Sequence, residues 1–483
     1  MRDERSKKLY DGITHIDDEL VEEAQARVPN HRPWLRWAAA AACLCLIVTG
    51  VLLARRPAAN SPNNTGPIPA LVAAEAHYPE MAPYPGENAS DKEQKAWFDS
   101  MRAQRNQPEG YADGLDAFFT ASARQLLSGA DGENRVCSPL NVYMALAMLA
   151  ETAGGESRQQ ILELLGADSI DTLRAQAKAV WNASYRDDGV NVVHLANSLW
   201  LRDDMDYVQS TADTLAENYY ASSYRGKMGS EAFDNALQVW LNSQTNDLLT
   251  QQASGVHLTP TTMLALASAI YFKAPWSDSF DPDNTSADVF HAPEQDLTRD
   301  FMHRTWLGSV YRGDGFAAVE LALLDSGSMW LLLPDEGMTP DELLAGDAMA
   351  FLLSDKWDEE ADDRAEPGTY IINLSLPKFD VASDLDLADG LQALGVTDVF
   401  YPGAADFSPL TDAESVCLYR AKHAARVTAD EDGVEAAAFT VLITDGEAPS
   451  NPEEYDFNLD RPFLFAITGT DGLPLFMGVV NEP

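Results

Sequence analysis

The sequence is poor in basic residues. It contains 33 Lys and Arg against 76 Asp and Glu, which gives a net charge of -43 over 483 residues. The deficit begins after residue 56, because the first 56 residues carry nine basic and eight acidic side chains while the rest carries 24 and 68. So acidic a surface repels phosphate backbones, which excludes nucleic acid as a partner. We interpret the acidic surface as a feature that keeps the protein soluble, and attraction of a basic protease is the alternative interpretation.

Cysteine and histidine are also scarce. The cysteines are Cys43, Cys45, Cys137 and Cys417, of which two lie in an apolar run and two are far apart in segments typical of a core. We therefore expect no disulfide. No C-x-x-C pair is present and only eight histidines are available, so the sequence predicts no metal site and no cofactor.

Catalytic motifs are missing as well. The sequence has no G-x-S-x-G nucleophile turn, no H-E-x-x-H pair and no Walker-type phosphate loop. A pair of carboxylates, as in glycosidases, would arise by chance in so acidic a chain. We therefore predict that the protein is not an enzyme.

One uncharged run lies near the N-terminus. Trp37 to Ala54 holds 18 residues without a charge, which as a helix span roughly 27 Å, close to the hydrocarbon thickness of a bilayer. Trp34 and Trp37 at one end favour the membrane interface. We interpret residues 34–56 as a transmembrane signal anchor. A cleaved signal peptide and a buried core helix are the alternatives.

Basic residues around this run predict its orientation. Three arginines between positions 27 and 36 precede it, and only Arg55 and Arg56 follow it closely. This distribution favours a cytoplasmic segment over residues 1–33. The expected location is the cell membrane, crossed once, with the rest of the protein extracellular. The anchor and the absence of a eukaryotic-style leader suggest a bacterial source.

Residues 57–110 are interpreted as a proline-rich extracytoplasmic linker. Eight prolines fall within 57–108 among polar residues, a composition that stays extended and cannot bury a core. Within it, the stretch from Asp91 to Arg105 is compatible with a helix. The remaining residues, 111–483, are expected to form one globular domain.

Within this domain the hydrophobic spacing changes along the chain. Helical spacing dominates early and strand-like runs come later. We expect helices at Leu115–Leu127, from Pro139 to the Gly154-Gly155 pair, at Gln159–Leu165 and at Asp234–Leu249, and strands at Ala265–Phe272, Ser328–Leu333, Tyr370–Leu376, Phe463–Ile467 and Leu475–Val480. Without a repeating βαβ pattern, this order predicts the α+β fold class.

The segment Glu431–Thr440 combines conflicting signals. Its three alanines favour a helix, yet Gly433 precedes them and a β-branched run follows. As a strand, one face would carry only small or uncharged side chains, and the other would carry Glu435. Such a strand can enter an existing sheet without burying a charge. A short surface helix followed by a loop is the alternative.

Six motifs in consistent order resemble those of the serpin family. The segment E-D-G-V-E-A-A-A-F-T resembles the hinge of inhibitory serpins. The other five motifs lie at Asn134–Gly166, Leu266–Trp276, Leu376–Phe379 (L-P-K-F), Leu394–Phe400 (L-G-V-T-D-V-F) and the C-terminal part from Phe457 onward. The resemblance covers residues from about 111 to 483.

The resemblance implies a serpin fold, with three β-sheets, about nine helices and an exposed reactive loop. A target serine protease, or a cysteine protease, would attack the loop as a substrate and form a covalent acyl complex. The cleaved loop would insert into the main sheet and distort the protease before the acyl bond hydrolyses. The implied activity is inhibition of serine-type endopeptidases by a monomer. A non-inhibitory serpin acting as a binding or chaperone-like module is the alternative.

Matching the family's motifs implies roles for single residues. Glu431 would lie at the root of the loop. The hinge would further contain Gly433, Val434, Glu435, Ala436, Ala437, Ala438 and Thr440, and the shutter and breach beneath the opening strands would contain Ser138, Pro139, Ser268, Trp276 and His423. Ser268 departs from the family, which often has Asn there, and a hydroxyl offers fewer hydrogen bonds than an amide. The departure puts the shutter network in doubt, and ordinary core packing is the alternative for each of these residues.

The family's usual loop length, counted from Gly433, places the reactive bond between Glu447 and Ala448. Pro449 disfavours cleavage of the next bond. A Glu at this position suits a glutamyl-selective protease, and the acidic loop tip disfavours the trypsin type. Cleavage after Ile443 or the threonine that follows it, which suits elastase-like enzymes, is the alternative.

Overall fold

The computed structural model describes residues 71–86, 89–354, 367–418, 421–434 and 452–483. They belong to one compact unit, Ser61–Pro483. The predicted cytoplasmic segment and the anchor at 34–56 lie outside the described residues. Within those residues, no helix combines the length and the apolar character needed to cross a membrane.

Several of the helices begin where the local sequence supplies a side-chain cap. Ser138 accepts a hydrogen bond from the backbone of Asn141, and Pro139 takes the first position of the helix that follows. The described residues contain eleven α-helices, against the nine or so expected: α4 (Asp91–Arg105), α5 (Leu115–Leu127), α6 (Pro139–Thr152), α7 (Gly155–Leu164), α8 (Ile170–Ser184), α9 (Gln209–Asn218), α10 (Glu231–Gln244), α11 (Thr250–Ser254), α12 (Pro340–Ala345), α13 (Ala348–Leu353) and α14 (Leu387–Ala393). Of these, α4 precedes the predicted domain and α11 has only five residues.

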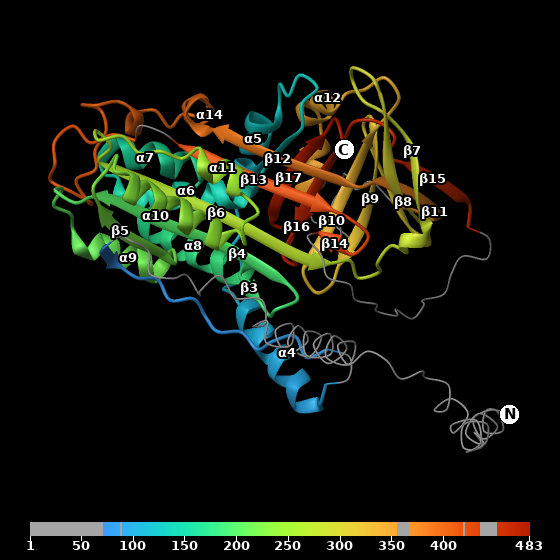
Figure 1. Ribbon diagram of the computed structural model, residues 1–483, viewed down its shortest axis with the longest axis horizontal. Helices are drawn as coiled ribbons and strands as arrows, with labels where there is room; N and C mark the ends of the chain where they lie inside the picture. Colours follow the sequence, from blue (N-terminus) through green and yellow to red (C-terminus); the bar gives the residue numbers. More distant parts are fainter. Residues whose placement is uncertain (1–70, 87–88, 355–366, 419–420, 435–451) are drawn as a thin grey trace, which may run out of the picture. The chain divides into compact units, whose positions relative to one another are not determined.

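The first sheet, here called sheet A, has the strand order β1-β5-β4-β6-β14-β13-β12 (Figure 1). Its strands are β1 (Leu71–Ala74), β5 (Ala221–Gly226), β4 (Val192–Arg202), β6 (Leu264–Pro275), β14 (Gly433–Val434), β13 (Lys422–Ala429) and β12 (Phe379–Asp386), and β3 (Arg186–Asp187) pairs with β4. All residues of β4 except the last are buried, so this strand lies in the interior of the protein.

The remaining strands form two sheets that share one long strand, β8 (Asp296–Gly313). Its last residues pair with β9, and most of its length pairs with β7 and β11. Sheet B contains the end of β8, β9 (Phe316–Leu323), β10 (Gly327–Pro334), β16 (Phe463–Thr468), β17 (Pro474–Val480) and β2 (Arg135–Cys137); sheet C contains β7 (Thr285–His291), β8, β11 (Gly368–Pro377) and β15 (Glu454–Asn458). The described residues thus contain the three predicted sheets.

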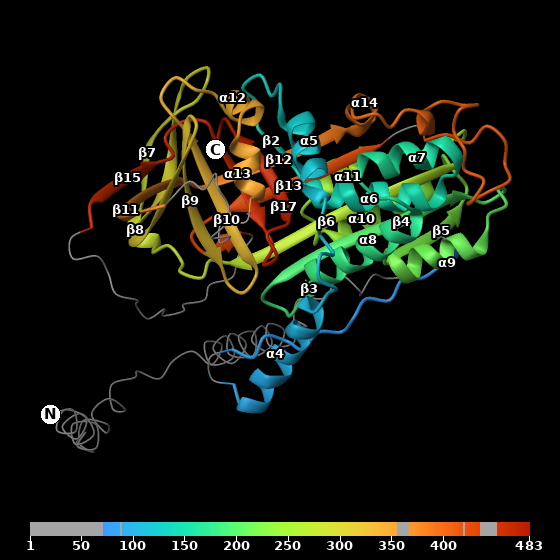
Figure 2. The same ribbon diagram turned by 180° about the vertical axis from the view of Figure 1, so that it is seen from behind.

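The core lies between sheet A and sheet B, and α6 runs through it. Nearly every residue of α6 is buried because the helix contacts both β6 and β17 (Figure 2). A second apolar cluster fills the other face of sheet A, where Trp200 of β4 packs with Phe233 and Trp240 of α10. The predicted α+β serpin fold is confirmed, and α5 has the predicted bounds.

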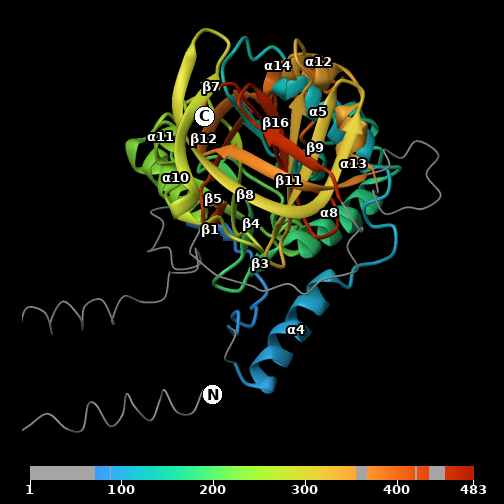
Figure 3. The same ribbon diagram turned by 90° about the vertical axis from the view of Figure 1, so that its right-hand side faces the viewer.

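The stretch predicted as a linker differs from the expectation in its described part. β1 joins sheet A because Leu71 and Val72 pair with the edge strand β5. The helix α4 stands at the edge of the protein next to β3 (Figures 1 and 3). It is amphipathic enough to bury Trp97 and Met101, four residues apart, against the domain. Proline-rich composition therefore did not prevent this segment from folding onto its neighbours.

Candidate functional site

A two-residue strand enters sheet A between two long strands. In β14, Gly433 pairs with Pro275, and Val434 pairs with Ala274 of β6 on one side and Ala429 of β13 on the other. Both pairings are antiparallel. A Cβ atom on Gly433 would lie 2.5 Å from the carbonyl oxygen of Ala274, so only glycine permits this close approach. The described part of this segment therefore ends at Val434, paired on both sides between β6 and β13.

Beyond Val434, β6 and β13 approach each other without pairing in the described part of the chain. Among the described residues, β6 and β13 are joined in the sheet only through β14. A small cavity of about 10 Å³ lies next to Val434 and is lined by Leu248, Phe272, Arg426, Val427, Thr428 and Phe476. Phe272 and Val427 come two residues beyond the pairing partners of Val434 on their strands. The cavity therefore lies where the next inward-facing side chain of a longer β14 would come.

The turn before β14 is fixed by Trp276, which is 1% exposed. Its indole Nε1 donates to the carbonyl of Asp430 (2.8 Å), and its backbone N–H donates to the carbonyl of Asp432 (3.1 Å). The Asp430 carboxylate accepts from the backbone N–H groups of Asp432 (3.0 Å) and Gly433 (3.3 Å). This aromatic residue thus holds the first turn of the loop at the end of β6.

Glu431 is held by two elements of the domain. Its carboxylate accepts from Lys378 Nζ (2.7 Å) and from the Thr285 hydroxyl (2.8 Å), and its carbonyl accepts from the backbone N–H of Phe280 (3.0 Å). Burial alone would raise the pKa of Glu431, but the hydrogen bonds from Lys378 and Thr285 outweigh burial and hold the pKa below its usual value. The hydrogen bond to Glu431 in turn raises the pKa of Lys378. Glu431 therefore stays ionised and attaches the loop root to sheet C.

The buried imidazole of His423 connects β13 to the start of α6. The backbone N–H of Ser138 donates to His423 Nε2 (2.9 Å), and the Ser138 hydroxyl accepts from the backbone of Asn141 (3.1 Å). Complete burial lowers the pKa of His423 to about 4. The ring is thus neutral at physiological pH, as an acceptor at Nε2 requires.

Ser268 lies in a cluster of buried amides. Its hydroxyl oxygen is 2.5 Å from Asn141 Oδ1 and 2.7 Å from Asn197 Oδ1. A hydroxyl has one proton, so it cannot satisfy both oxygens at once. Within the described part of the chain, Asn141 Nδ2 is buried without a hydrogen-bond partner. Ser268 thus faces one amide from α6 and one from β4, and the oxygens of both lie within hydrogen-bond distance of its hydroxyl.

The structure brings the described site residues into two groups. Trp276, Glu431, Gly433 and Val434 lie together at the end of β6, and the shutter residues Ser138, Pro139, Ser268 and His423 lie along the facing parts of α6, β6 and β13. The rest of the hinge (Glu435, Ala436, Ala437, Ala438 and Thr440) and the bond between Glu447 and Ala448 lie outside the described residues.

Sequence reasoning missed four residues of the site. Lys378 and Thr285 hold the loop root, and Asn141 and Asn197 complete the polar cluster at Ser268. Asn141 follows Ser138 by three residues in one of the recognised motifs, and Lys378 belongs to L-P-K-F, so the motifs themselves pointed to these two residues.

In the described ranges, no three His, Cys, Asp or Glu residues come together as a metal site would require.

Comparison with known proteins gives a consistent result. The family model described as "Serpin (serine protease inhibitor)" matches residues 114–483. Serpin-Z2B of Triticum aestivum is 29% identical over 388 residues, which cover 76% of this chain and 94% of that protein. Plasminogen activator inhibitor 1 of Sus scrofa is also 29% identical over 388 residues, with 74% and 89% covered.

Solved structures share the fold at lower identity. Tengpin, a thermophilic serpin in its native state, has a TM-score of 0.66 at 24% identity and covers 78% of this chain and 95% of its own. Human thyroxine-binding globulin complexed with thyroxine has a TM-score of 0.65 at 21% identity, with 77% of this chain and 99% of that chain covered. The family model spans most of the chain, and members of this family are mostly protease inhibitors. The chain belongs to the serpin family.

Proposed function

We propose that the protein is a serine-type endopeptidase inhibitor that acts as a suicide substrate. The protease would cleave the reactive loop, and its nucleophile would stay attached to the loop as an acyl ester. Insertion of the cleaved loop into sheet A would carry the protease away from the site of attack before water hydrolyses that ester. The observation that carries this proposal is β14, because the chain that would insert already occupies the first positions between β6 and β13.

The pairing of β14 predicts the register in which the rest of the loop would enter. Each residue added after Val434 moves the partner one residue back along β6 and along β13. Ala436 would then come opposite Phe272 and Val427, at the small cavity. An alanine fits there, whereas a longer or charged side chain would have to enter the core.

The same register supports a role for the shutter. Six residues after Val434 comes Thr440, which would lie opposite Ser268 and His423. Thr440 would thus add a hydroxyl to the polar cluster of Ser268, Asn141 and Asn197.

The length of β6 supports the bond after Glu447 as the cleavage site. In this register Thr444 comes opposite Leu264, the first residue of β6. Cleavage after Glu447 would therefore allow the loop to fill the whole strand and move the attached protease by roughly 40 Å. Cleavage after Ile443 would leave the last position of β6 unpaired and move the protease less far. We propose a glutamyl-selective target, with elastase-like enzymes as the alternative.

Incubation with a protease panel tests this function. We expect a complex that survives SDS with a glutamyl-selective enzyme, and a released C-terminal fragment that begins at Ala448. Ala436→Arg should convert the inhibitor into a substrate, because its charge would have to enter at the cavity. Glu435→Arg is the matched control, since it places the same side chain on the opposite face of the strand. Equal complex yields for both variants would contradict insertion in this register.

A non-inhibitory serpin that serves as a binding or chaperone-like module remains the second function to test. Among the described residues, β6 and β13 do not pair beyond β14, and this together with the small side chains predicted to enter between them supports the inhibitory function over this one. Cleavage by every protease of the panel without any covalent complex would favour the binding module. Hydrolysis of a protease substrate by the protein itself would contradict both, because neither function makes it an enzyme.

The membrane location is a separate proposal. Residues 34–56 would anchor the protein, with the serpin domain outside the cell and free to meet a secreted protease. We expect the full chain to sediment with membranes and its domain to be accessible to protease added from outside. A soluble product that begins near residue 57 would show cleavage after the apolar run instead.

A further inference from the structure

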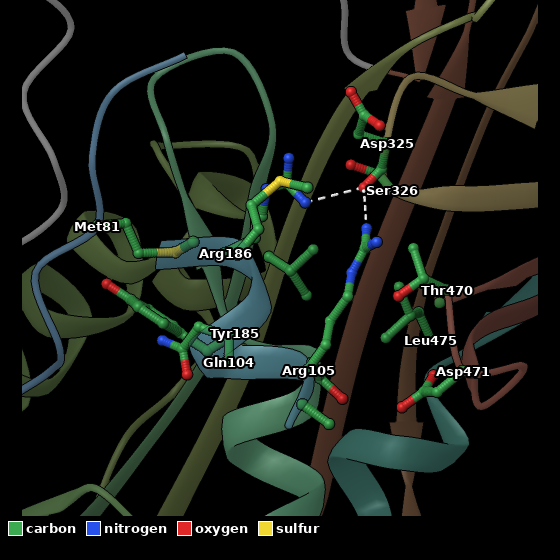
Figure 4. A pocket seen from close by; sticks show the side chains of 15 residues that line it. Met81, Gln104, Arg105, Tyr185, Arg186, Asp325, Ser326, Thr470, Asp471 and Leu475 are labelled. Atoms are coloured by element: carbon green, nitrogen blue, oxygen red, sulfur yellow. Dashed lines mark hydrogen bonds between the residues drawn. The ribbon is translucent and has the colours of Figure 1, made fainter. Parts of the chain in front are cut away.

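A small cavity lies where α4 meets the rest of the domain. Its volume is about 30 Å³, and its walls come from α4, the end of α8, β3, the β9–β10 turn and the β16–β17 turn (Figure 4). A water molecule needs roughly 10–15 Å³ of such space. The cavity can therefore hold one or two ligands of about that size, whereas a phosphate or sulfate, with four oxygens around its central atom, needs more room.

Two guanidinium groups end at this cavity. Arg105 Nη2 donates to the carbonyl of Asp325 (3.1 Å), and Arg186 Nη1 donates to the same carbonyl (2.8 Å). Figure 4 shows the two groups converging on it. A guanidinium has five N–H donors, and among the described residues Arg105 uses one of them, in this bond. Arg105 thus brings unused donors to the cavity that it lines.

Two serine hydroxyls also line the cavity. Ser326, in the β9–β10 turn, is 6% exposed, and Ser184, at the end of α8, is partly buried. The Oγ atoms of both are buried and, within the described part of the chain, form no hydrogen bond. A buried hydroxyl without a partner costs free energy, so such groups are usually satisfied by a ligand or a water molecule. The pair of hydroxyls therefore indicates that this cavity is occupied in solution.

The two cations differ in how their charge is neutralised. Arg186 pairs with the fully buried carboxylate of Asp188 (2.8 Å), whereas Arg105 bonds to a neutral carbonyl. Burial and then repulsion by Arg186 lower the pKa of Arg105, and the carboxylates of Asp325 and Asp471 oppose this shift. An anion beside Arg105 would offset the same repulsion. Both the charge and the free donors of the cavity therefore favour an anion over a neutral ligand.

We propose that this cavity is a binding site for a small monovalent anion of the size of chloride, held by Arg105, Arg186 and Ser326. The guanidinium groups supply charge and N–H donors, and the Ser326 hydroxyl donates its free proton. The net charge of -43 opposes binding, but salt screens charges further away than about 10 Å. The carboxylates of Asp325 and Asp471 compete with the anion. The site is separate from the reactive loop and does not depend on the proposed function.

The test follows melting of the full-length chain in detergent while sodium chloride replaces sodium gluconate at constant ionic strength. Gluconate is too large for the cavity. Ser326→Ala removes the unpartnered hydroxyl, and Arg105→Gln removes one charge. Arg102→Ala, at an exposed position of the same helix, is the matched control. Asp325→Asn removes a competing carboxylate, and Asn tolerates the positive φ of 49° at this position as Asp does.

We expect chloride to raise the melting temperature of wild type and of Arg102→Ala along a saturating curve, by about 2 °C at a ten-fold excess over Kd. In gluconate, Ser326→Ala should melt with wild type or above it, because it loses only an unsatisfied hydroxyl. Its response to chloride, and that of Arg105→Gln, should fall by more than about half. Asp325→Asn should reach half-saturation at a lower chloride concentration.

Two results would overturn the site and leave water as the occupant of the cavity. One is a chloride response of wild type that does not saturate, and the other is an equal response in wild type and Ser326→Ala. Crystals grown in bromide give a direct check, since the anomalous signal of a bound bromide should appear in the cavity lined by Arg105 and Ser326. A cavity without that signal would likewise contradict the proposal.

Discussion

Acid should destabilise the native protein through one buried imidazole, His423. Burial lowers its pKa from 6.5 to about 4, and its Nε2 accepts from the backbone of Ser138 in the neutral form. In the unfolded chain the same ring titrates near its ordinary pKa. Between pH 6.5 and about 4 the unfolded state therefore binds a proton that the folded state does not bind.

The sign and size of the effect follow from this difference. Because the unfolded state binds more protons in this window, stability rises with pH across it. The stabilisation is fully present above the unfolded pKa and is lost as the pH falls towards the folded pKa of about 4. A shift of this size corresponds to roughly 3 kcal/mol. In a domain of this length, that is on the order of 5 °C in melting temperature.

Melting of the native, uncleaved protein between pH 7.5 and pH 4 measures the effect. Carboxylates also titrate near the lower limit, so the comparison is with His423→Gln, whose amide oxygen can accept from Ser138 without titrating in this range. The difference between the two melting curves should grow as the pH falls below about 6.5. Parallel curves would refute the assignment of His423 as a neutral, buried acceptor.

Three further predictions concern the loop and its root. Gly433→Ala should lower the melting temperature of the native form, measured by circular dichroism, because its Cβ would meet the Ala274 carbonyl at 2.5 Å; an unchanged value would contradict the pairing of β14. Glu431→Gln and Lys378→Met should each lower the free energy of unfolding by about 1 kcal/mol or less, since the Lys378 side chain is 39% exposed. In chemical denaturation, the double variant should lose no more stability than either single variant. Additive losses would mean that the two side chains do not act as one interaction. Proteolytic nicking of the loop should raise the melting temperature by on the order of tens of degrees, whereas nicking of an ordinary loop is neutral or destabilising; equal melting before and after would favour the non-inhibitory class.

The fold was predictable where local patterns and ordered motifs agree. α5 has the predicted bounds Leu115–Leu127 because its large apolar residues recur at helical spacing and are buried. β1 was not predictable, since Leu71–Ala74 lies in a proline-rich stretch and becomes a strand only by pairing with β5. α4 was compatible with a helix in the sequence, but its attachment to Asp188 and Asp325 depends on contacts far apart along the chain.

The sequence indicated which residues form the site better than it indicated the strand pairings and hydrogen bonds between them. Local signals around Gly433 conflict, and the strand conformation of β14 comes from its neighbours β6 and β13 rather than from propensity. The substitution of Ser268 for the family's frequent Asn was visible in the sequence. The polar partners of Ser268 were not visible, because Asn141 and Asn197 lie 127 and 71 residues away from it. Only the packing of α6 on sheet A brings these amides together.

The side chains on one face of the loop can be compared with the apolar and polar positions that they would meet between β6 and β13. The face of the proposed inserting strand carries Val434 and two alanines before Thr440, so most of it adds only apolar surface to the core. The acceptor space is apolar at Phe272 and polar at Ser268 and His423. A hydroxyl is the smallest group that can bond to a buried amide without bringing a charge into the core. If the loop inserts as proposed, the register read from two pairings at the end of β6 would bring the loop's first inward-facing hydroxyl to the polar part of this space.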